Sequence, residues 1–212
     1  MCKRVIELFS SETPNTRKIS IMLEEIDYKF KVTKVDLSKG EQFSDEFRKI
    51  SPFSKTPVIV DHENSKSIFE SGAILIYLGE KSGKFYNNKD RNIINQWLMA
   101  QMANVGPMIG QHHQFHYFNP GKSKFGEDKF FEQAKRIYGD LEERLSKEKY
   151  LAGEDYTIAD IATWPWISRH EWHDIGLKSY KYLSDWYIKI SNREAVIKGF
   201  DFMKNGAKIP QP

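Results

Sequence analysis

Two neighbouring stretches decide the fold of this chain: residues 55–61 read KTPVIVD, and residues 68–73 read IFESGA. Pro57 cannot donate a backbone hydrogen bond, so it fits the entry to a strand rather than its middle. Thr56, just before it, is pushed into an extended conformation. Ser71 is a good N-cap for the apolar-periodic segment that follows it. The stretches therefore predict a strand, a short return strand and a helix.

The same stretches also predict groups that can bind a ligand. The backbone of Thr56 lies outside the strand ladder and can pair with another molecule. A helix that starts at Ser71 offers a site for a carboxylate. Together these features predict a surface that holds a small peptide, with backbone pairing at one end and a carboxylate pocket at the other.

Composition limits the classes of function. The chain has 212 residues, of which 40% are hydrophobic and 29% charged, and its formal net charge is +3. These values are typical of an ordinary soluble protein with one large or two small domains. The lysines are scattered among acidic residues, which argues against a nucleic-acid partner. Since no apolar run is long enough to span a bilayer, we expect no membrane association.

The chain contains one cysteine, Cys2. A single cysteine excludes an intramolecular disulfide framework and a Cys-x-x-Cys redox pair. The first residues lead into a predicted strand and do not resemble a signal peptide. We therefore expect a cytoplasmic protein.

Residues 1–83 predict a compact α/β unit, because short runs of strand length alternate with segments of helical period. Gly83, with a lysine nearby, ends the last helix of this unit. The expected order is strand, helix, strand, helix, strand, strand and helix, over Val5–Phe9, Asn15–Glu25, Phe30–Val35, Phe43–Ile50, Val58–Asp61, Ser67–Phe69 and Ser71 to about Gly83.

Residues 84–89 resemble a linker, and residues 90–212 predict an all-helical domain, because every later periodic stretch has helical spacing. Gly106-Pro107 invites a break in the first long helix. Thr157-Ile158-Ala159-Asp160 forms a capping box with Asp in place of the usual Glu, so we assign Asp160 to capping and not to catalysis. The expected helices cover roughly residues 90–116, 128–147, 157 onward, 182–191 and 193–203.

Over essentially its whole length the chain resembles the soluble glutathione transferases. The resemblance rests on Thr56-Pro57, on the Glu70-Ser71 helix start and on the capping box. Four further segments are similar to the bacterial nu class, whose members are glutathione-dependent disulfide-bond reductases, and to fungal nitrogen-regulating prion proteins. They are Thr13-Pro14-Asn15, Gly40-Glu41-Gln42-Phe43, residues 69–74 (FESGAI) and residues 106–113 (GPMIGQHH).

This resemblance implies a thioredoxin-like N-terminal domain with a four-stranded mixed sheet, followed by an all-α helical bundle. It implies an enzyme that uses the thiolate of bound glutathione as cosubstrate, with a small disulfide or an electrophile as second substrate in a pocket between the domains. Disulfide-bond reduction is the main activity expected, with transferase and peroxidase side activity. A homodimer is also implied. The alternative is a non-catalytic ligand-binding or protein-interaction module of the same fold.

In such a unit, the loop after the first strand holds the reactive group at a helix N-terminus. Here that loop, residues 10–15, has no cysteine, so the reactive sulfur has to belong to glutathione. Thr13 and Asn15 are the candidate catalytic donors to that sulfur, as the nu-class resemblance also implies. Ser10 and Ser11 are further candidates. A plain N-cap with Pro14 near the first helical position is compatible with this role.

The resemblance also implies how the remaining parts of glutathione are bound. The backbone of Thr56, held by a cis Pro57, pairs with the cysteinyl portion, and Glu70 and Ser71 bind the γ-glutamyl end. Gln42 reaches the glycyl end, whose carboxylate Lys55 can neutralise. Lys55 can equally be a solvated surface lysine. Lys129 falls where related proteins carry an arginine that reaches glutathione, and a lysine keeps the charge but loses the bidentate geometry.

His112 and His116 are four residues apart and can share one face of a helix, which raises the question of a metal site. No cysteine or acidic residue stands at a matching spacing, and Gly106-Pro107 can distort the helix. We therefore predict no metal and assign these histidines to the lining of a cleft or to a dimer contact.

Overall fold

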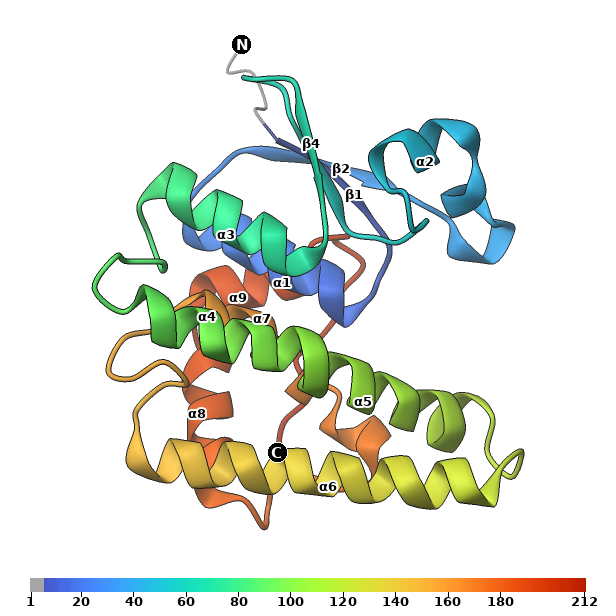
Figure 1. Cartoon of the computed structure of the whole chain (residues 1–212), viewed down its shortest axis with the longest axis vertical. Helices are drawn as coiled ribbons and strands as arrows, with labels where there is room; N and C mark the ends of the chain where they lie inside the picture. The colour runs from blue at the N-terminus through green and yellow to red at the C-terminus, as the bar shows by residue number, and fades with distance from the viewer. Residues whose placement is uncertain (1–5) are drawn as a thin grey trace. The chain divides into compact units, whose positions relative to one another are not determined.

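The computed structural model describes residues 6–212, so the Val5 end of the first predicted strand and Cys2 lie outside the described residues. By its internal contacts the chain divides into two compact units. The first contains the described residues up to Lys84 together with residues 194–208, and the second contains residues 85–193 and 209–212. Figure 1 labels most of the helices and strands of both units.

A mixed four-stranded sheet forms the centre of the first unit, with strand order β2-β1-β3-β4. Strand β1 runs parallel to β2, whereas β3 is antiparallel to both β1 and β4. The described strands are β1 (Ile6–Ser10), β2 (Phe30–Lys34), β3 (Val58–Asp61) and β4 (Lys66–Phe69). The sheet expected from the sequence is therefore present, and it is mixed as predicted.

The register of the strands defines the two faces of the sheet. Val58 lies opposite both Phe9 and Phe69, so these three side chains share one face. They pack with Phe47 of α2 (Asp45–Ile50), which follows two short turns, η1 (Leu37–Lys39) and η2 (Glu41–Phe43). Leu8 and its partner Ile59 point to the other face and are fully buried. One face therefore packs on α2, and the other belongs to the main core of the unit.

Helices α1 (Pro14–Glu25) and α3 (Ser71–Ser82) pack against one another in this unit (Figure 1). Thr13 caps α1, because its side chain accepts a hydrogen bond from the backbone N–H of Thr16. Gly83 ends α3 with a left-handed φ of +69°, as its predicted role as the C-terminal stop requires.

Helix α9 (Glu194–Phe200) packs closely on α1 (Figure 1). The Ser20 hydroxyl donates a 2.6 Å hydrogen bond to the Gly199 carbonyl. A Cβ at position 199 would lie 2.6 Å from the Ile21 Cα, so glycine is required for this approach. By its contacts α9 belongs to the first unit, although the sequence analysis grouped it with the helical domain. The reason is a contact across about 180 residues, which local periodicity does not report.

In the second unit, the predicted break at Gly106-Pro107 takes the form of a widened helical turn. The Gly106 N–H bonds to the Gln101 carbonyl five residues earlier, as in a π-helix. Pro107 has no N–H to donate to the regular ladder, so the wider turn accommodates it within the helix. The segment comprises α4 (Arg91–Ala100), η3 (Gln101–Val105), α5 (Gly106–His112) and η4 (His113–Phe118).

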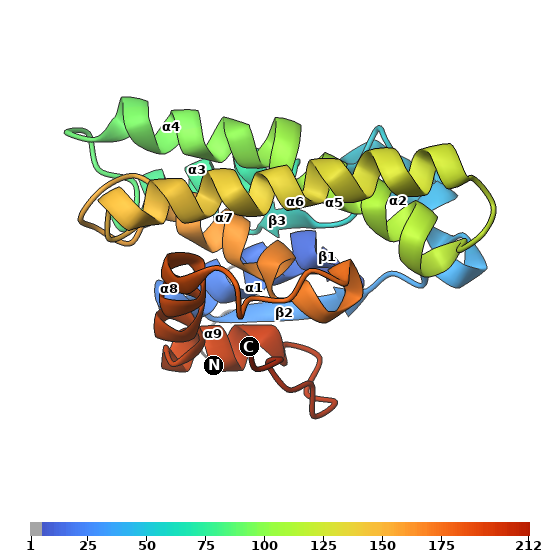
Figure 2. The same cartoon turned by 90° about the horizontal axis from the view of Figure 1, so that it is seen from below.

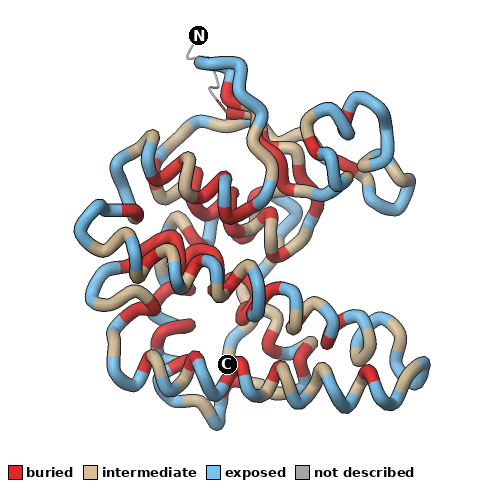
Figure 3. Tube along the Cα trace, viewed as in Figure 1, coloured by how far each residue is buried: buried red, intermediate tan, exposed pale blue. Residues whose placement is uncertain are grey.

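Helix α6 (Lys124–Lys147) lies beside α5 in both views (Figures 1 and 2). Buried and exposed residues alternate along α6 with helical period, as the tube in Figure 3 shows. The other helical elements of this unit are α7 (Ile158–Ile167), η5 (His170–His173) and α8 (Lys181–Ser191). No helix among residues 6–212 is both long and apolar enough to cross a membrane.

The capping box at the start of α7 is present, as predicted. Thr157 accepts from the N–H of Ala159, and Asp160 accepts from the N–H of Thr157 at 3.0 Å. The fully buried Asp160 also accepts hydrogen bonds from the Leu151 N–H and the Trp186 indole. These contacts give Asp160 a structural role within the second unit. The linker at residues 84–89 stays a prediction.

Candidate functional site

The sheet topology brings three predicted segments of the first unit together. Because β3 is antiparallel to β1 and β4, the residues before β3 lie beside the residues that follow those two strands. The residues before β3 are Thr56 and Pro57. The segments after β1 and β4 are the loop of residues 11–15 and the Glu70-Ser71 helix start. The candidate site therefore occupies one edge of the sheet.

The loop after β1 presents Thr13 at the N-terminus of α1. The Thr13 hydroxyl oxygen lies 3.3 Å from the Thr16 nitrogen and 3.2 Å from the Thr16 hydroxyl oxygen. Thr13 and Asn15 are half-buried, so both keep contact with the surface. Ser10 is fully buried, which removes it from the candidate donors to a bound thiol.

Two serines make hydrogen bonds at this edge: Ser11, a further candidate donor to the sulfur, and Ser51, which the sequence did not single out. The hydroxyl oxygen of Ser11 lies 2.7 Å from that of Thr56, which joins the loop to the proline turn. The buried Ser51 donates to the Lys55 carbonyl at 2.7 Å and accepts from the Lys55 N–H at 3.0 Å. The Thr56–Pro57 peptide bond is cis, as the resemblance implied, and the β3 ladder begins at Val58.

The predicted N-cap at Ser71 is wrong, because Glu70 occupies the cap position and Ser71 is the first residue of α3. Glu70 has φ +68° and ψ +118°, a conformation that side chains disfavour. Strained residues of this kind cluster at functional sites. The backbone conformation of Glu70 turns the chain from β4 into α3. The N–H groups of the first turn of α3 therefore lie at the candidate site.

Lys18 is the polar neighbour of this helix start that the sequence analysis missed. It is 1% exposed, and its ammonium nitrogen lies 3.3 Å from the Ser71 hydroxyl oxygen. Burial holds the pKa of Lys18 well below its ordinary value, and the charge of Glu70 opposes that shift. The signal that could have found it is a lysine one residue before the apolar stripe of α1.

Three other residues were predicted to contact glutathione: Gln42, Lys55 and Lys129. Gln42 is half-buried in η2, and the side chain of Lys55 is exposed. Lys129 belongs to α6 in the second unit, where its ammonium lies 5.5 Å from the ring centre of Phe125 and 5.6 Å from that of Phe130. Gln42, Lys55 and Lys129 stay predictions as glutathione contacts.

His112 and His116 stack on one another within a larger cluster of aromatic rings, with their ring centres 4.8 Å apart. The Nε2 of His112 lies 2.8 Å from the His173 carbonyl oxygen, and His173 Nδ1 lies 2.6 Å from the Tyr138 hydroxyl. Across residues 6–212 there is no group of three or more His, Cys, Asp or Glu side chains arranged to hold a metal ion. The cluster is therefore part of the packing of the second unit.

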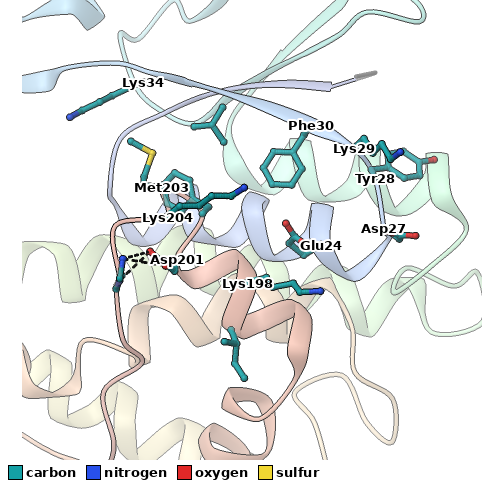
Figure 4. A pocket seen from close by; sticks show the side chains of 15 residues that line it. Glu24, Asp27, Tyr28, Lys29, Phe30, Lys34, Lys198, Asp201, Met203 and Lys204 are labelled. Carbon is teal, nitrogen blue, oxygen red and sulfur yellow. Dashed lines mark hydrogen bonds between the residues drawn. The ribbon is translucent and has the colours of Figure 1, made fainter. Parts of the chain in front are cut away.

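A surface hollow of about 1100 Å³ lies elsewhere on the first unit. Figure 4 shows it between Glu24 near the end of α1, Asp27 just after that helix, Phe30 of β2 and the segment that follows α9. There the Asp201 carboxylate accepts hydrogen bonds from the backbone N–H groups of residues 205–207. Glu24 and Asp27 mark the C-terminal end of α1, whereas the candidate site is at its N-terminal end. The hollow is therefore separate from that site.

Comparisons with known proteins agree with this geometry. Residues 4–80 match the glutathione S-transferase N-terminal domain, and residues 102–194 match the glutathione S-transferase C-terminal domain. The chain is 40% identical over 198 residues to the disulfide-bond oxidoreductase YfcG of Escherichia coli (strain K12), covering 90% of this chain and 92% of that protein.

Solved structures give the same result. A glutathione transferase from Burkholderia graminis, with two glutathione molecules bound per subunit, has a TM-score of 0.90 and 35% identity, covering 96% of this chain and 90% of that one. A glutathione transferase from Pseudomonas putida, with one glutathione disulfide bound per subunit, has a TM-score of 0.87 and 36% identity, covering 93% and 91%. The chain belongs to the glutathione S-transferase family.

Proposed function

We propose that this protein is an enzyme that binds glutathione at the sheet edge formed by Ser11–Asn15, Thr56–Pro57 and Glu70–Ser71, and that it reduces small disulfides. The observation that carries the proposal is the convergence of these segments on a loop without cysteine. A tripeptide that brings its own thiol supplies the nucleophile that the loop lacks. The names and bound ligands of the relatives, a disulfide-bond oxidoreductase and structures with glutathione or its disulfide, support this assignment.

Each end of glutathione has a matching group at this edge. The Thr56 backbone, held before Pro57 and outside the β3 ladder, pairs with the cysteinyl portion. The γ-glutamyl carboxylate binds at the first turn of α3, where the helix dipole favours an anion. Glu70 takes the γ-glutamyl ammonium, and Ser71 takes the carboxylate. Gln42 and Lys55 serve the glycyl end, and Lys129 is a further basic contact in the proposal.

The loop has enough polar groups to activate the thiol. Lowering a thiol pKa by about 2 units requires about 2.7 kcal/mol of preferential stabilisation of the thiolate. One hydrogen bond to a charged acceptor contributes roughly 1.5–3 kcal/mol, and a helix N-terminus adds roughly 0.3–1 kcal/mol. The buried Thr16 can donate its hydroxyl proton to Thr13, which leaves the Thr13 proton for the sulfur. Asn15 supplies the second donor.

The reaction is a thiol–disulfide exchange in two steps. The thiolate of bound glutathione attacks one sulfur of the substrate disulfide, so a mixed disulfide forms and one substrate thiolate leaves. A second glutathione thiolate then attacks the glutathione sulfur of the mixed disulfide and releases the other substrate thiolate. Two glutathione molecules are oxidised to one glutathione disulfide, and one disulfide is reduced to two thiols. Attack of the same thiolate on an electrophilic carbon or on a peroxide gives the side activities.

Parallel assays with hydroxyethyl disulfide, a chlorinated nitrobenzene and cumene hydroperoxide test the proposal. We expect the disulfide to be the best of the three substrates. If it is the poorest, the disulfide-reductase assignment is wrong. If neither glutathione nor its disulfide binds in a calorimetric titration, the chain is instead a non-catalytic module of the same fold.

Variants of Thr13 test the role of the loop. Thr13→Ala should lower kcat for disulfide reduction by about tenfold or more, the value of one hydrogen bond to a charged sulfur. Thr13→Ser should retain most of the activity. Ser123→Ala is the matched control, because Ser123 caps α6 through the Gly126 N–H and its loss removes a cap from the second unit only. Equal losses of kcat in Thr13→Ala and Ser123→Ala would mean that Thr13 acts only as a cap.

We also propose that the enzyme is a homodimer in a reducing compartment such as the cytoplasm. The solved relatives are described per protein subunit, which supports an assembly of several chains. Light scattering on the purified chain should give twice the 24.9 kDa of one chain. A mass near 24.9 kDa at micromolar concentration would contradict the dimer.

A further inference from the structure

Lys18 is an unusual residue for the interior of α1. It is 1% exposed and among the largest fully buried side chains in residues 6–212. Taking an ammonium out of water costs several kcal/mol unless nearby groups compensate for it. An apolar residue of similar length would fill the same space without that cost. A lysine at this position therefore suggests that its amine has a use.

The geometry around Lys18 indicates that use. Its nitrogen lies 3.3 Å from the Ser71 hydroxyl oxygen, in a fully buried contact. The amine of Lys18 donates in this contact, so the Ser71 oxygen accepts and the Ser71 proton points away from Lys18. Ser71 is the first residue of α3, at the helix end that faces the candidate site. A Ser71 proton directed there is a donor to an anion at the helix N-terminus.

We propose that Lys18 is a positioning residue for the glutathione site, whose amine orients the Ser71 hydroxyl toward the γ-glutamyl carboxylate. This inference rests on the proposed glutathione function and deepens it, because it names a residue that does not touch the ligand. Lys18 acts through Ser71.

The charged surroundings of Lys18 are consistent with this role. Glu70, at the cap of α3, is the charged group whose interaction favours protonated Lys18, while burial lowers the pKa of the amine. From α9, Gly199 and Phe200 meet α1 at Ser20 and Arg17 through backbone carbonyls. A carboxylate arriving at the first turn of α3 brings a second negative charge close to Lys18. Ligand binding and protonation of Lys18 therefore reinforce one another.

The test is a double-mutant cycle between Lys18→Met and Ser71→Ala, with glutathione affinity measured by calorimetry. Lys18→Met keeps roughly the length of the side chain and removes the amine that donates to Ser71. We expect it to weaken glutathione binding by roughly tenfold, the loss of one charge-assisted hydrogen bond. In a Ser71→Ala background the same substitution should have less than a twofold effect. Equal effects in both backgrounds would overturn the proposal.

A second ligand separates positioning from a general effect on folding. A glutathione analogue that lacks the γ-glutamyl α-carboxylate should bind wild type and Lys18→Met with the same affinity. In the disulfide assay, Lys18→Met should raise KM for glutathione by about tenfold and change kcat at saturation by less than twofold. Lys18→Gln, whose amide can still donate to Ser71, should recover part of the affinity.

Lys31→Met is the matched control, because Lys31 is an exposed lysine of β2 that pairs with Glu7. Its glutathione affinity should equal that of wild type. If wild type itself binds no glutathione, the proposed function fails. If wild type binds glutathione and Lys18→Met binds it equally well, the function stands and the role of Lys18 is refuted.

Discussion

The hydroxyl oxygens of Ser11 and Thr56 lie 2.7 Å apart, although 45 residues separate them in the chain. This contact joins the loop that we propose for thiol activation to the turn that we propose for binding the peptide backbone. This side-chain hydrogen bond therefore helps to fix the position of the loop after β1 relative to the turn before β3.

Ser11→Ala should lower the free energy of unfolding by about 0.5–1.5 kcal/mol and raise KM for glutathione by roughly two- to tenfold, because it removes that bond. Thr56→Val should have a similar effect, and the double variant should be little worse than either single variant. Steady-state kinetics and urea unfolding measure both quantities. Ser82→Ala is the control, since the Ser82 hydroxyl bonds to the Leu78 carbonyl within its own helix. Additive effects of Ser11→Ala and Thr56→Val would contradict the coupling.

At position 70, glycine should give a more stable protein than alanine, the reverse of the usual order of these two residues. At φ +68° an alanine keeps the backbone strain, whereas glycine adopts this conformation without it. We expect Glu70→Gly to be more stable than Glu70→Ala by about 1 kcal/mol in urea unfolding, with both variants losing glutathione affinity. Greater stability of Glu70→Ala would show that the strain is absent in solution.

The histidine cluster should make the protein sensitive to mild acid. Burial, with smaller contributions from Arg169 and His112, lowers the pKa of His113 to about 3. Between pH 6.5 and pH 3 the unfolded chain therefore binds a proton at His113 that the folded chain does not, so stability is lost as the pH falls. From pH 7 to pH 5 this histidine alone should reduce the free energy of unfolding by about 2 kcal/mol.

Urea unfolding at several pH values measures this loss. His113→Gln should reduce its slope, and the His113 ring should show no titration between pH 7 and pH 5 by NMR. Burial also lowers the pKa of the neighbouring His112 and His173, so they add to the slope in the same direction. An identical slope in wild type and His113→Gln would contradict the assignment.

Two glycine substitutions should have opposite effects. Gly199→Ala should cost about 1–3 kcal/mol, because its Cβ would meet the Ile21 backbone at 2.6 Å. Gly139→Ala, at an exposed position of α6 where the added Cβ would meet no atom within 4 Å beyond the adjoining backbone of its own helix, should gain about 1 kcal/mol from helix propensity. Thermal unfolding measures both. A Gly199→Ala variant as stable as wild type would mean that α9 does not pack on α1 in solution.

Local sequence patterns were sufficient to predict most elements of the fold. The run Val58–Asp61 is a strand with the predicted bounds, because Pro57 fixes its start and Val58 and Ile59 are fully buried. The box at Thr157 and Asp160 was predictable for the same reason, since all its hydrogen bonds except those to Leu151 and Trp186 are local. The sequence also identified the three segments that meet at the sheet edge.

What the sequence did not reveal depends on strain or on distant contacts. No propensity rule places a glutamate at positive φ, so the cap of α3 was assigned one residue too late, at Ser71. Amphipathic patterning treats a lysine as a surface residue, so the burial of Lys18 was missed. The contact between Ser20 and Gly199 joins residues 179 positions apart, beyond the reach of any local pattern.

That last contact has a consequence for synthesis of the chain. During translation residues 6–84 leave the ribosome long before residues 194–208, yet both segments belong to one compact unit. The face of α1 that carries Ser20 and Ile21 stays uncovered by α9 while residues 85–193 of the second unit are made. The first unit begins to emerge first but is completed only after residues 85–193 of the second unit have been made, so a nascent chain stalled before residue 194 keeps this apolar face open to chaperones.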